Sequence, residues 1–428
     1  MRLITDWHVH SKYSRACSKD LELGTIEAWC RRKGIQVVAT GDWTHPKWFA
    51  HLQDELIECE PGLYRRKATS PDERFVRFML VTELSQIYKK GDTTRRIHNL
   101  VFSPSLETCE KVNKELIKRG FNLASDGRPI LGIDSEDLYK LLKEIDERII
   151  LIPAHAWTPW YSVFGSKSGF DSLEECFGDM SNYIYAIETG LSSDPKMNWS
   201  VSGLDSVVLI SNSDAHSPRN LGREANVFDL ENPSYDAFVQ VLKDQDRSKF
   251  LYTIEFYPEE GKYHFDGCAD HLYSCHPREG KKHDDRCITC KRKLTLGVLN
   301  RVEELANREP ESVETNKIPF KSIVPLAEIL AEAFDVSSTS SKKVVAEHMR
   351  LTDVVADEFT LLLETPLEII AKSASHPRVH EAIRRVREGK LHITPGYDGI
   401  FGKVKIFGDE EKFEKKQTKL FFFSSGRA

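Results

Sequence analysis

Short, continuous apolar runs recur through about the first 230 residues of the chain, separated by polar or helical stretches. Runs that stay apolar at consecutive positions indicate strands buried on both faces. Two of the intervening stretches, 22–33 and 135–146, have the pattern expected of helices. This alternation predicts a parallel α/β sheet or barrel. The apolar runs span residues 3–9, 35–40, 75–82, 98–102, 149–154, 183–188 and 206–211.

The pattern changes in the second half of the chain. Residues 262–294 are rich in cysteine, histidine and charge, whereas 320–390 regain a helical period. A glycine-punctuated stretch, 391–407, predicts a small β element. Leu326, Ile329, Leu330 and Phe334 share one face of the first helix of this region, and further helices are expected around 341–349 and 377–388. We expect an α/β domain over 1–235, a cysteine module over 236–310, a mainly helical domain over 311–407 and a charged tail over 408–428.

Composition narrows the class of protein. The chain of 428 residues is 40% hydrophobic and 29% charged, as soluble globular proteins are, and its length predicts two or three domains. The start of the sequence lacks the pattern of a signal peptide, and no apolar run is long enough for a membrane span, so a cytoplasmic protein without a membrane partner is expected. The net charge of −6 argues against wholesale coating of nucleic acid but allows a local basic face.

Side chains that bind metals follow nearly every apolar run. In α/β barrels the active site is assembled at the carboxyl ends of the strands, so these side chains should meet. The His-x-His and Asp-x-His pairs each point to one side of a strand. Imidazoles with carboxylates suit Zn²⁺, Mn²⁺ or Fe²⁺, and the carboxylates also allow Mg²⁺, so two or three divalent ions are expected. The candidate ligands are His8, His10, Asp42, Glu83, His98, His155, Glu188, Asp214 and His216.

Four cysteines form a separate cluster. Cys268, Cys275, Cys287 and Cys290 have one close CxxC pair and predict a structural Zn²⁺ held by four thiolates. One histidine could replace a sulfur; the alternatives are His264, His271, His276 and His283. The remaining interpretation is that the four cysteines are surface thiols without a metal. Residues 276–293 hold seven Lys or Arg against three Asp or Glu, which favours contact with nucleic acid.

The segments DWHVHSKYS, GDW, TELS, PAHAW and SNSDAHS resemble the successive motifs of the polymerase-and-histidinol-phosphatase (PHP) superfamily. That resemblance implies a distorted seven-stranded (β/α)7 barrel with a trinuclear metal centre over about residues 1–230, followed by the zinc module and a mainly helical C-terminal domain. The family's second motif is usually Thr-Asp-His, where this chain has Gly41-Asp42-Trp43. One histidine ligand is therefore missing or displaced, with His45 the nearest replacement.

Over nearly its full length, the chain resembles the endonuclease Q family, through the barrel motifs, CxxCKRKLTLGVLNRVEELA and PGYDGIFGKVKIF. The resemblance implies a DNA repair endonuclease, associated with the nucleoid, that nicks 5′ to uracil, hypoxanthine, xanthine or an abasic site. Metal-activated water would leave a 3′-hydroxyl and a 5′-phosphate, with Asp214, Glu83 and His216 as catalytic residues. The alternatives are a small-molecule phosphatase like histidinol phosphatase and a non-catalytic, metal-containing DNA-binding module.

Two further groups of residues suggest partners. Reading a flipped base needs aromatic walls and polar groups, which Trp157, Trp160, Tyr161 and Asn212 could supply to damaged duplex DNA, with single-stranded DNA as a further candidate. The alternative is that the rings plug the barrel mouth and that Asn212 stabilises a turn. In the tail, Gln417, Leu420 and Phe423 resemble the motif by which repair enzymes bind a sliding clamp, although Ser424 stands at its last aromatic position. Alternatively, the tail phenylalanines fold back onto the protein.

Overall fold

The computed structural model of the chain describes residues 1–69, 76–408 and 410–411. Within these residues, eleven strands form one mixed sheet. They are β1 (Arg2–Asp6), β2 (Val37–Ala39), β3 (Leu56–Glu60), β4 (Leu63–Arg66), β5 (Arg77–Lys90), β6 (Thr93–Ser103), β7 (Ile130–Leu131), β8 (Ile150–Pro153), β11 (Ala225–Asp229), β12 (Phe250–Glu255) and β15 (Phe320–Ser322). A separate parallel pair consists of β9 (Ala186–Glu188) and β10 (Val208–Ile210).

Backbone pairing connects seven of these strands in a ring. β1 pairs parallel with β2 and β2 with β5, whereas β6 runs antiparallel to both β5 and β8. The link from β8 to β9 is a hydrogen bond from the Ala156 N–H to the Glu188 carbonyl. A parallel bridge between Val9 and Ala215 returns from the end of β10 to the end of β1. The segments that the apolar runs predicted are therefore strands, but the ring is mixed because β6 reverses direction.

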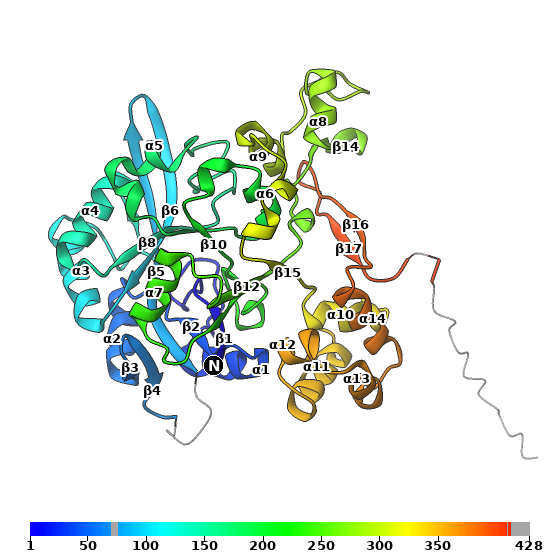
Figure 1. Cartoon of the computed structure of the whole chain (residues 1–428), viewed down its shortest axis with the longest axis horizontal. Helices are drawn as coiled ribbons and strands as arrows, with labels where there is room; N and C mark the ends of the chain where they lie inside the picture. Colours follow the sequence, from blue (N-terminus) through cyan, green and yellow to red (C-terminus); the bar gives the residue numbers. More distant parts are fainter. Residues whose placement is uncertain (70–75, 409, 412–428) are drawn as a thin grey trace, which may run out of the picture.

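Helices cover the outside of this ring, as Figure 1 shows for α3, α4 and α7. Several begin at a Ser or Asp whose side chain accepts from a backbone N–H in the first turn, as Ser105, Asp134 and Ser234 do. The expected helices 22–33 and 135–146 are confirmed as α1 and α4. The helices are α1 (Leu23–Lys33), α2 (Pro46–Glu55), α3 (Leu106–Lys118), α4 (Ser135–Ile145), α5 (Leu173–Phe177), α6 (Pro195–Trp199) and α7 (Tyr235–Asp244).

The core of the ring is aromatic and apolar. Trp7 is 1% exposed and its ring lies 5.2–5.7 Å from the rings of Phe102, Phe228 and Phe238. These rings come from the residue after β1 and from β6, β11 and α7, so one cluster connects four segments distant in sequence. β5 and β6 extend beyond their apolar runs as a two-stranded hairpin that projects from the body of the protein (Figure 1).

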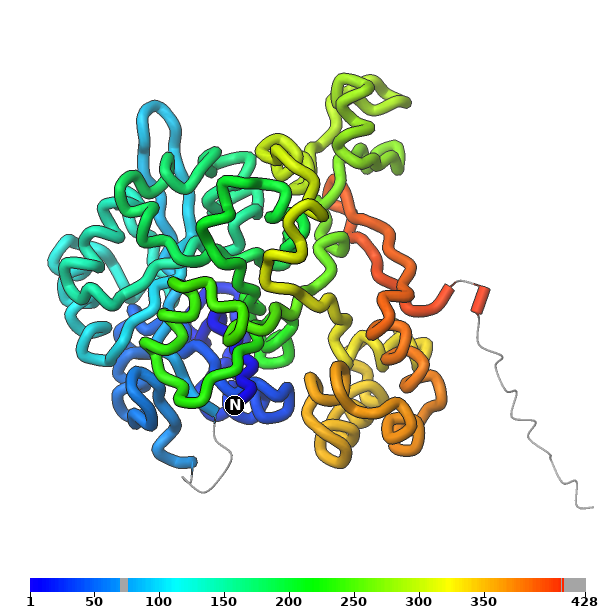
Figure 2. The backbone as a smooth tube through the Cα atoms, in the orientation of Figure 1, coloured from blue at the N-terminus to red at the C-terminus, as the bar shows by residue number. Residues whose placement is uncertain are grey.

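The sheet extends past residue 235. Residues 250–255 form β12 against β11, and β15 then pairs parallel with β12. Between these two strands, the chain leaves the sheet to form the cysteine-rich segment, which lies beside the β16–β17 hairpin in Figure 2. Its elements are β13 (Asp266–Cys268), β14 (Tyr273–Cys275), α8 (Pro277–Gly280) and α9 (Val298–Leu305), and the hairpin consists of β16 (His392–Thr394) and β17 (Lys403–Lys405).

The expected helical C-terminal region is present. It contains α10 (Leu326–Ala333), α11 (Lys342–Val354), α12 (Glu358–Leu363), α13 (Leu367–Ser373) and α14 (Arg378–Arg387). Among the residues described, no helix combines the length and apolar character that crossing a lipid bilayer requires.

A buried ion pair joins this helical region to α1. Glu358 accepts from Lys33 at 2.9 Å and lies 2.8 Å from His348 Nε2, and all three are at most 5% exposed. Burial alone would raise the pKa of Glu358, but Lys33 and His348 outweigh it and lower the pKa from 4.5 to about 2. Since the folded pKa is depressed, this stabilisation is present above about pH 4.5 and is lost as the pH falls toward 2.

Replacing Glu358 by Gln should lower the free energy of unfolding by about 3–5 kcal/mol, because Lys33 would stay buried without its counter-charge. Denaturant unfolding at pH 7 measures the change. The control is Glu364→Gln, which removes the half-exposed partner of Arg2 across the same junction and should cost at most about 1 kcal/mol. Equal losses in the two variants would contradict the assignment.

Candidate metal centre

The histidines and carboxylates that follow the strands meet at one end of the ring. His8 and His10 follow β1, Glu83 and His98 lie within the paired strands β5 and β6, and His155 follows β8. Their ligand atoms form three overlapping groups, each with all atoms within 4.8 Å of one another. The groups are His8, His10 and Glu83; Glu83, His98 and His155; and His10, Asp214 and His216.

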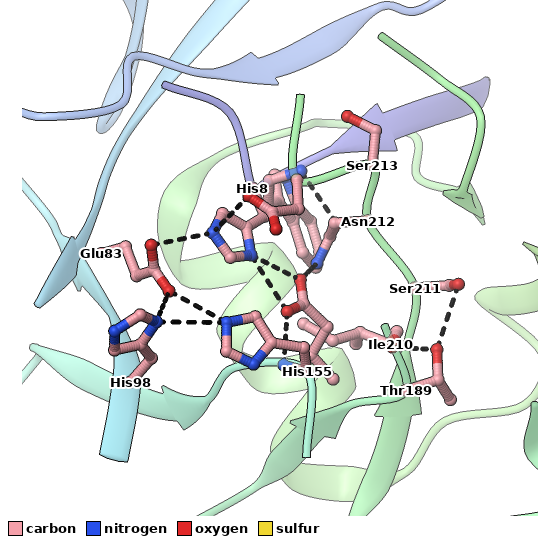
Figure 3. A network of polar contacts seen from close by, with 12 residues as sticks. His8, Glu83, His98, His155, Thr189, Ile210, Ser211, Asn212 and Ser213 are labelled. Atoms are coloured by element: carbon pink, nitrogen blue, oxygen red, sulfur yellow. Dashed lines mark hydrogen bonds and ion pairs between the residues drawn. The ribbon is translucent and has the colours of Figure 1, made fainter. Parts of the chain in front are cut away.

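Glu83 is the centre of this arrangement (Figure 3). Its Oε1 lies 2.6 Å from His98 Nδ1 and 3.1 Å from His155 Nε2. Its Oε2 lies 3.4 Å from the Nε2 atoms of both His8 and His10. Burial of this fully enclosed carboxylate would raise its pKa, but His98, Arg128 and His8 outweigh that effect and hold the pKa well below its usual range. Glu83 is therefore an anion that can bridge two cations.

Two further carboxylates contact the ring nitrogens of His8 and His10 that face away from Glu83. The Nδ1 atom of His8 lies 3.0 Å from Glu188, and that of His10 lies 3.1 Å from Asp42. This leaves the Nε2 atom of each ring facing the centre, which is the arrangement by which carboxylates orient metal-binding histidines. Asp42 and Glu188, both expected as ligands, are therefore placed next to ligands and lie outside the three groups.

The donor set fits divalent metal ions. His8 Nε2 is buried and lacks a hydrogen-bond partner, although buried polar atoms are nearly always paired. It lies 3.4 Å from Glu83 Oε2 and 3.5 Å from Asp214 Oδ1, in one group with His10. Imidazole nitrogen with carboxylate oxygen is the donor set of Zn²⁺, Mn²⁺ and Fe²⁺. An ion at this position would give His8 the partner that the protein itself does not supply.

The backbone is held in uncommon conformations at three of these residues. Asp42, His155 and Asp214 have φ angles of 44°, 29° and 47°, in the left-handed region that is unfavourable for residues with a side chain. Buried Asp6 accepts from the Ser213 N–H at 3.0 Å and so fixes the loop that carries Asp214. Strain of this kind persists only where the surroundings impose it, which is typical of functional sites.

The centre is closed on most sides and open on one. Glu83, His8 and His10 have side chains at most 1% exposed, whereas Asp214 is 27% and His216 is 31% exposed. Arg128 is 23% exposed, and its Nη1 donates to Glu83 Oε2 at 2.8 Å. These three side chains are therefore the part of the centre that solvent reaches.

Two of the expected substrate residues are structural. Trp157 is 1% exposed, donates from Nε1 to Asn198 at 2.7 Å and packs on Phe164, so it belongs to the core. Asn212 is fully buried, and its amide accepts from the Trp7 N–H and donates to Glu188. Its hydrogen-bonding groups are used inside the protein, so it has none to offer a base.

The other two aromatic residues are less buried than Trp157. Trp160 is 49% exposed and stacks under the Arg96 guanidinium, whose carbon is 5.0 Å from the ring centre. Tyr161 lies against the ring of His98, with centroids 4.7 Å apart. A short turn, in which Tyr161 has a φ of 62°, separates exposed Trp160 and half-buried Tyr161 from buried Trp157.

The unusual second motif is explained by packing. Trp43, where the family usually has histidine, is fully buried in the core. His45, the expected replacement, stacks on Tyr13 at 4.4 Å and belongs to none of the three groups. Sequence reasoning missed Arg128, because it lies in the polar turn Asp126-Gly127-Arg128, which follows no apolar run.

The cysteine module holds a second group. Cys268, His271, Cys287 and Cys290 bring their ligand atoms within 4.8 Å of one another. Cys275 is not among them, which corrects the expected four-thiolate set. The hairpin register explains the difference: Cys275 pairs with Asp266, farther from the turn, whereas His271 lies in the turn that follows Cys268. A hydrogen bond from Arg292 lowers the pKa of Cys290 to about 6, which favours its thiolate form.

The tail residues Gln417, Leu420 and Phe423 lie outside the described residues. The expected clamp-binding motif therefore stays a prediction.

Comparison with known proteins relates the chain to two families. Residues 209–246 match the PHP-associated family, and residues 325–390 match the MJ0043 C-terminal domain. The protein MJ0043 of Methanocaldococcus jannaschii is 29% identical over 294 residues, which are 66% of this chain but only 36% of MJ0043. YqxK of Bacillus subtilis is 26% identical over 427 residues, covering 94% of this chain and 99% of YqxK.

Two solved structures have the same fold. The lesion-specific endonuclease PfuEndoQ from Pyrococcus furiosus is 29% identical with a TM-score of 0.82, and the match covers 99% of this chain and 100% of that one. An endonuclease Q solved with a 27-mer duplex carrying an abasic lesion at its active site is 30% identical with a TM-score of 0.81. That match covers 96% of this chain and 98% of the solved one. The chain belongs to the endonuclease Q family.

Proposed function

We propose that this protein is a metal-dependent DNA repair endonuclease that nicks the strand 5′ to deaminated bases and abasic sites. The observation that carries the proposal is the cluster of five imidazoles gathered around the two carboxylates of Glu83 and Asp214. It occurs in a chain whose 30% identical relative was solved with an abasic duplex at its active site. In this proposal the ring of strands is a distorted (β/α)7 barrel of the PHP type that holds two or three divalent ions.

Each part of the proposed reaction can be matched to residues of the centre. Bound divalent ions supply Lewis acidity and make water acidic enough to act as a nucleophile at neutral pH. Glu83, Asp214 and the Nε2 atoms of His8 and His10 would hold them, while His216 stands at the open side. Water attacks phosphorus, the bond from phosphorus to the 3′-oxygen of the preceding nucleotide breaks, and that oxygen takes a proton. The products are a 3′-hydroxyl and a 5′-phosphate.

The rest of the chain favours DNA over a small phosphate ester. The similarity to the solved endonucleases extends through the cysteine module and the helical region, which a small-molecule phosphatase does not need. Lys281, Lys282, Arg286, Lys291 and Lys293 of the module are exposed, and such cations can neutralise backbone phosphates. A binding module without catalysis is also disfavoured, because it would not need an open metal centre.

Contact with the damaged nucleotide is assigned to exposed Trp160 and half-buried Tyr161. Trp160, braced by Arg96, presents a ring on which a base can stack, and Tyr161 lies between it and the His98 ligand. Duplex DNA with a lesion is the proposed partner, with single-stranded DNA as a second. A sliding clamp is proposed as a partner of the tail; a peptide of residues 412–428 that shows no binding in calorimetry would reject that part.

The first prediction of the proposed function concerns the nicking activity. The protein should nick one strand of duplexes that contain uracil, hypoxanthine, xanthine or an abasic site, only with a divalent ion present. The nick should be extended directly by a DNA polymerase, because it carries a 3′-hydroxyl. Gel analysis with and without chelator measures this, with an undamaged duplex as control. Nicking of undamaged DNA at the same rate, or a 3′-phosphate, would refute the proposal.

The second prediction separates chemistry from binding. Asp214→Asn or Glu83→Gln should abolish nicking while lesion binding stays within about threefold, because these side chains hold metal. Trp160→Ala should instead weaken lesion binding by about 1–3 kcal/mol through loss of stacking. Fluorescence anisotropy and single-turnover nicking give the two quantities. Trp157 is buried, so its replacement would disturb the core and cannot serve as a control. The aromatic control is therefore Tyr183→Ala, at an exposed ring. Full activity of Asp214→Asn would exclude the assignment.

The third prediction concerns the zinc of the cysteine module. The double variant Cys287→Ser, Cys290→Ser should lose about one zinc per chain, the content of a four-ligand structural site. Cys275→Ser should keep that zinc, whereas His271→Ala should lower its retention during dialysis against a chelator. Elemental analysis must subtract the ions of the barrel centre. Zinc loss from Cys275→Ser with full retention in His271→Ala would restore the four-thiolate set.

A further inference from the structure

Arg128 is the one cation that the described structure brings into contact with the metal-binding carboxylates by a side-chain hydrogen bond. Its guanidinium is mostly buried, and within the described residues its side chain makes a single hydrogen bond, to Glu83. Guanidinium carries five N–H donors, so most of its donor capacity is not used by the protein. It also lies at the open side of the centre, with Asp214 and His216.

The turn that carries Arg128 is held in place from several directions. The Gly127 N–H donates to the Tyr13 carbonyl at 3.0 Å, and the Pro129 carbonyl accepts from the Ser85 N–H at 3.1 Å. The Arg128 N–H itself donates to the Asp126 side chain at 3.1 Å. The turn is thereby attached to the loop after β1 and to β5, the two elements that carry His10 and Glu83.

Gly127 permits this close approach. A Cβ atom at position 127 would lie 2.3 Å from both Asp42 Oδ2 and Ser14 Oγ, closer than any side chain tolerates. The absence of a side chain therefore lets the turn lie directly against the carboxylate behind His10. The fold places Arg128 at the centre through contacts that involve neither its charge nor Glu83.

Charge balance argues for an anionic ligand. Asp42, Glu83, Glu188 and Asp214 carry four negative charges, which two divalent ions would already neutralise. Arg128 then leaves the centre with a net positive charge in a poorly solvated position, which is costly unless an anion binds there. A phosphodiester carries one negative charge and two non-bridging oxygens, and guanidinium matches the geometry of such oxygens.

We propose that Arg128 donates a hydrogen bond to a non-bridging oxygen of the scissile phosphate and holds that phosphate against the metal centre. The inference rests on the proposed endonuclease function. It assigns to Arg128 a contact with the reacting group, in which the charge that develops on the phosphate oxygens during attack is stabilised. Its contact with Glu83 is then the position that it holds before DNA binds.

Single-turnover nicking tests the proposal, with duplexes that carry an abasic site and a single Rp or Sp phosphorothioate at the scissile position. The assays use Mn²⁺, which accepts sulfur readily, so that discrimination arising at the metal is suppressed. The wild type should cleave one diastereomer more slowly. Arg128→Ala should cleave the all-oxygen duplex about 10²–10³-fold more slowly and should lose the preference between diastereomers. Arg128→Lys should recover only part of the rate, because ammonium lacks the fork of donors.

The control is Arg119→Ala, which removes an exposed arginine paired with Glu115 on α3 and should leave the rate and the preference unchanged. Metal content per chain, measured by elemental analysis, should be equal in wild type and Arg128→Ala. Loss of metal from Arg128→Ala, or retention of the wild-type preference between diastereomers in that variant, would overturn this inference but not the proposed function. Absence of nicking by the wild type on every lesion duplex would overturn the proposed function and the inference with it.

Discussion

A carboxylate that is removed from water must be stabilised by the groups around it, and Glu83 is surrounded on all sides by nitrogen. Imidazoles reach it from the ends of β1 and β8 and from β6, and Arg128 reaches it from the turn before β7. β1, β6 and β8 belong to the strand ring, and β7 pairs with β5, the strand of Glu83. The ring must therefore close for the charge to be compensated, which makes correct folding and assembly of the metal centre one requirement.

The other residues of the centre orient the side chains that surround the charge of Glu83. His8 and His10 turn their Nε2 atoms inward because Glu188 and Asp42 contact the other ring nitrogen of each. These two carboxylates are held in turn by the serines after His10 and by the amide of Asn212. Layers of hydrogen bonds thus fix the direction of each donor atom before any ion arrives, and a preorganised set binds metal with less reorganisation.

The sequence could predict those parts of the centre that depend on local pattern. Continuous apolar runs identify buried strands, and residues after such runs meet at one end of a barrel, which is why His8, Glu83, His155 and Asp214 were identifiable. Arg128 was not, because its position depends on a turn packed against Tyr13 and Ser85, far away in sequence.

The remaining differences arose from geometry that spacing does not encode. The register of the β13–β14 hairpin decides that His271, and not Cys275, joins the other cysteines. In the loop after His155, composition shows that aromatic residues are present, but the packing of Trp157 on Phe164 and its bond to Asn198 decide which ring is buried. β12 and β15 extend the sheet past residue 235, and their pairing with β11 and with each other joins segments far apart in sequence.

The place of β15 has a consequence for synthesis on the ribosome. β12 pairs with β11 on one side. Its partner on the other side, Phe320–Ser322, is synthesised some 65 residues later. Until then β12 is an open strand edge, the kind of surface that invites pairing with other chains. The cysteine-rich segment emerges within that interval, so all of its candidate metal ligands are made before the sheet edge is covered.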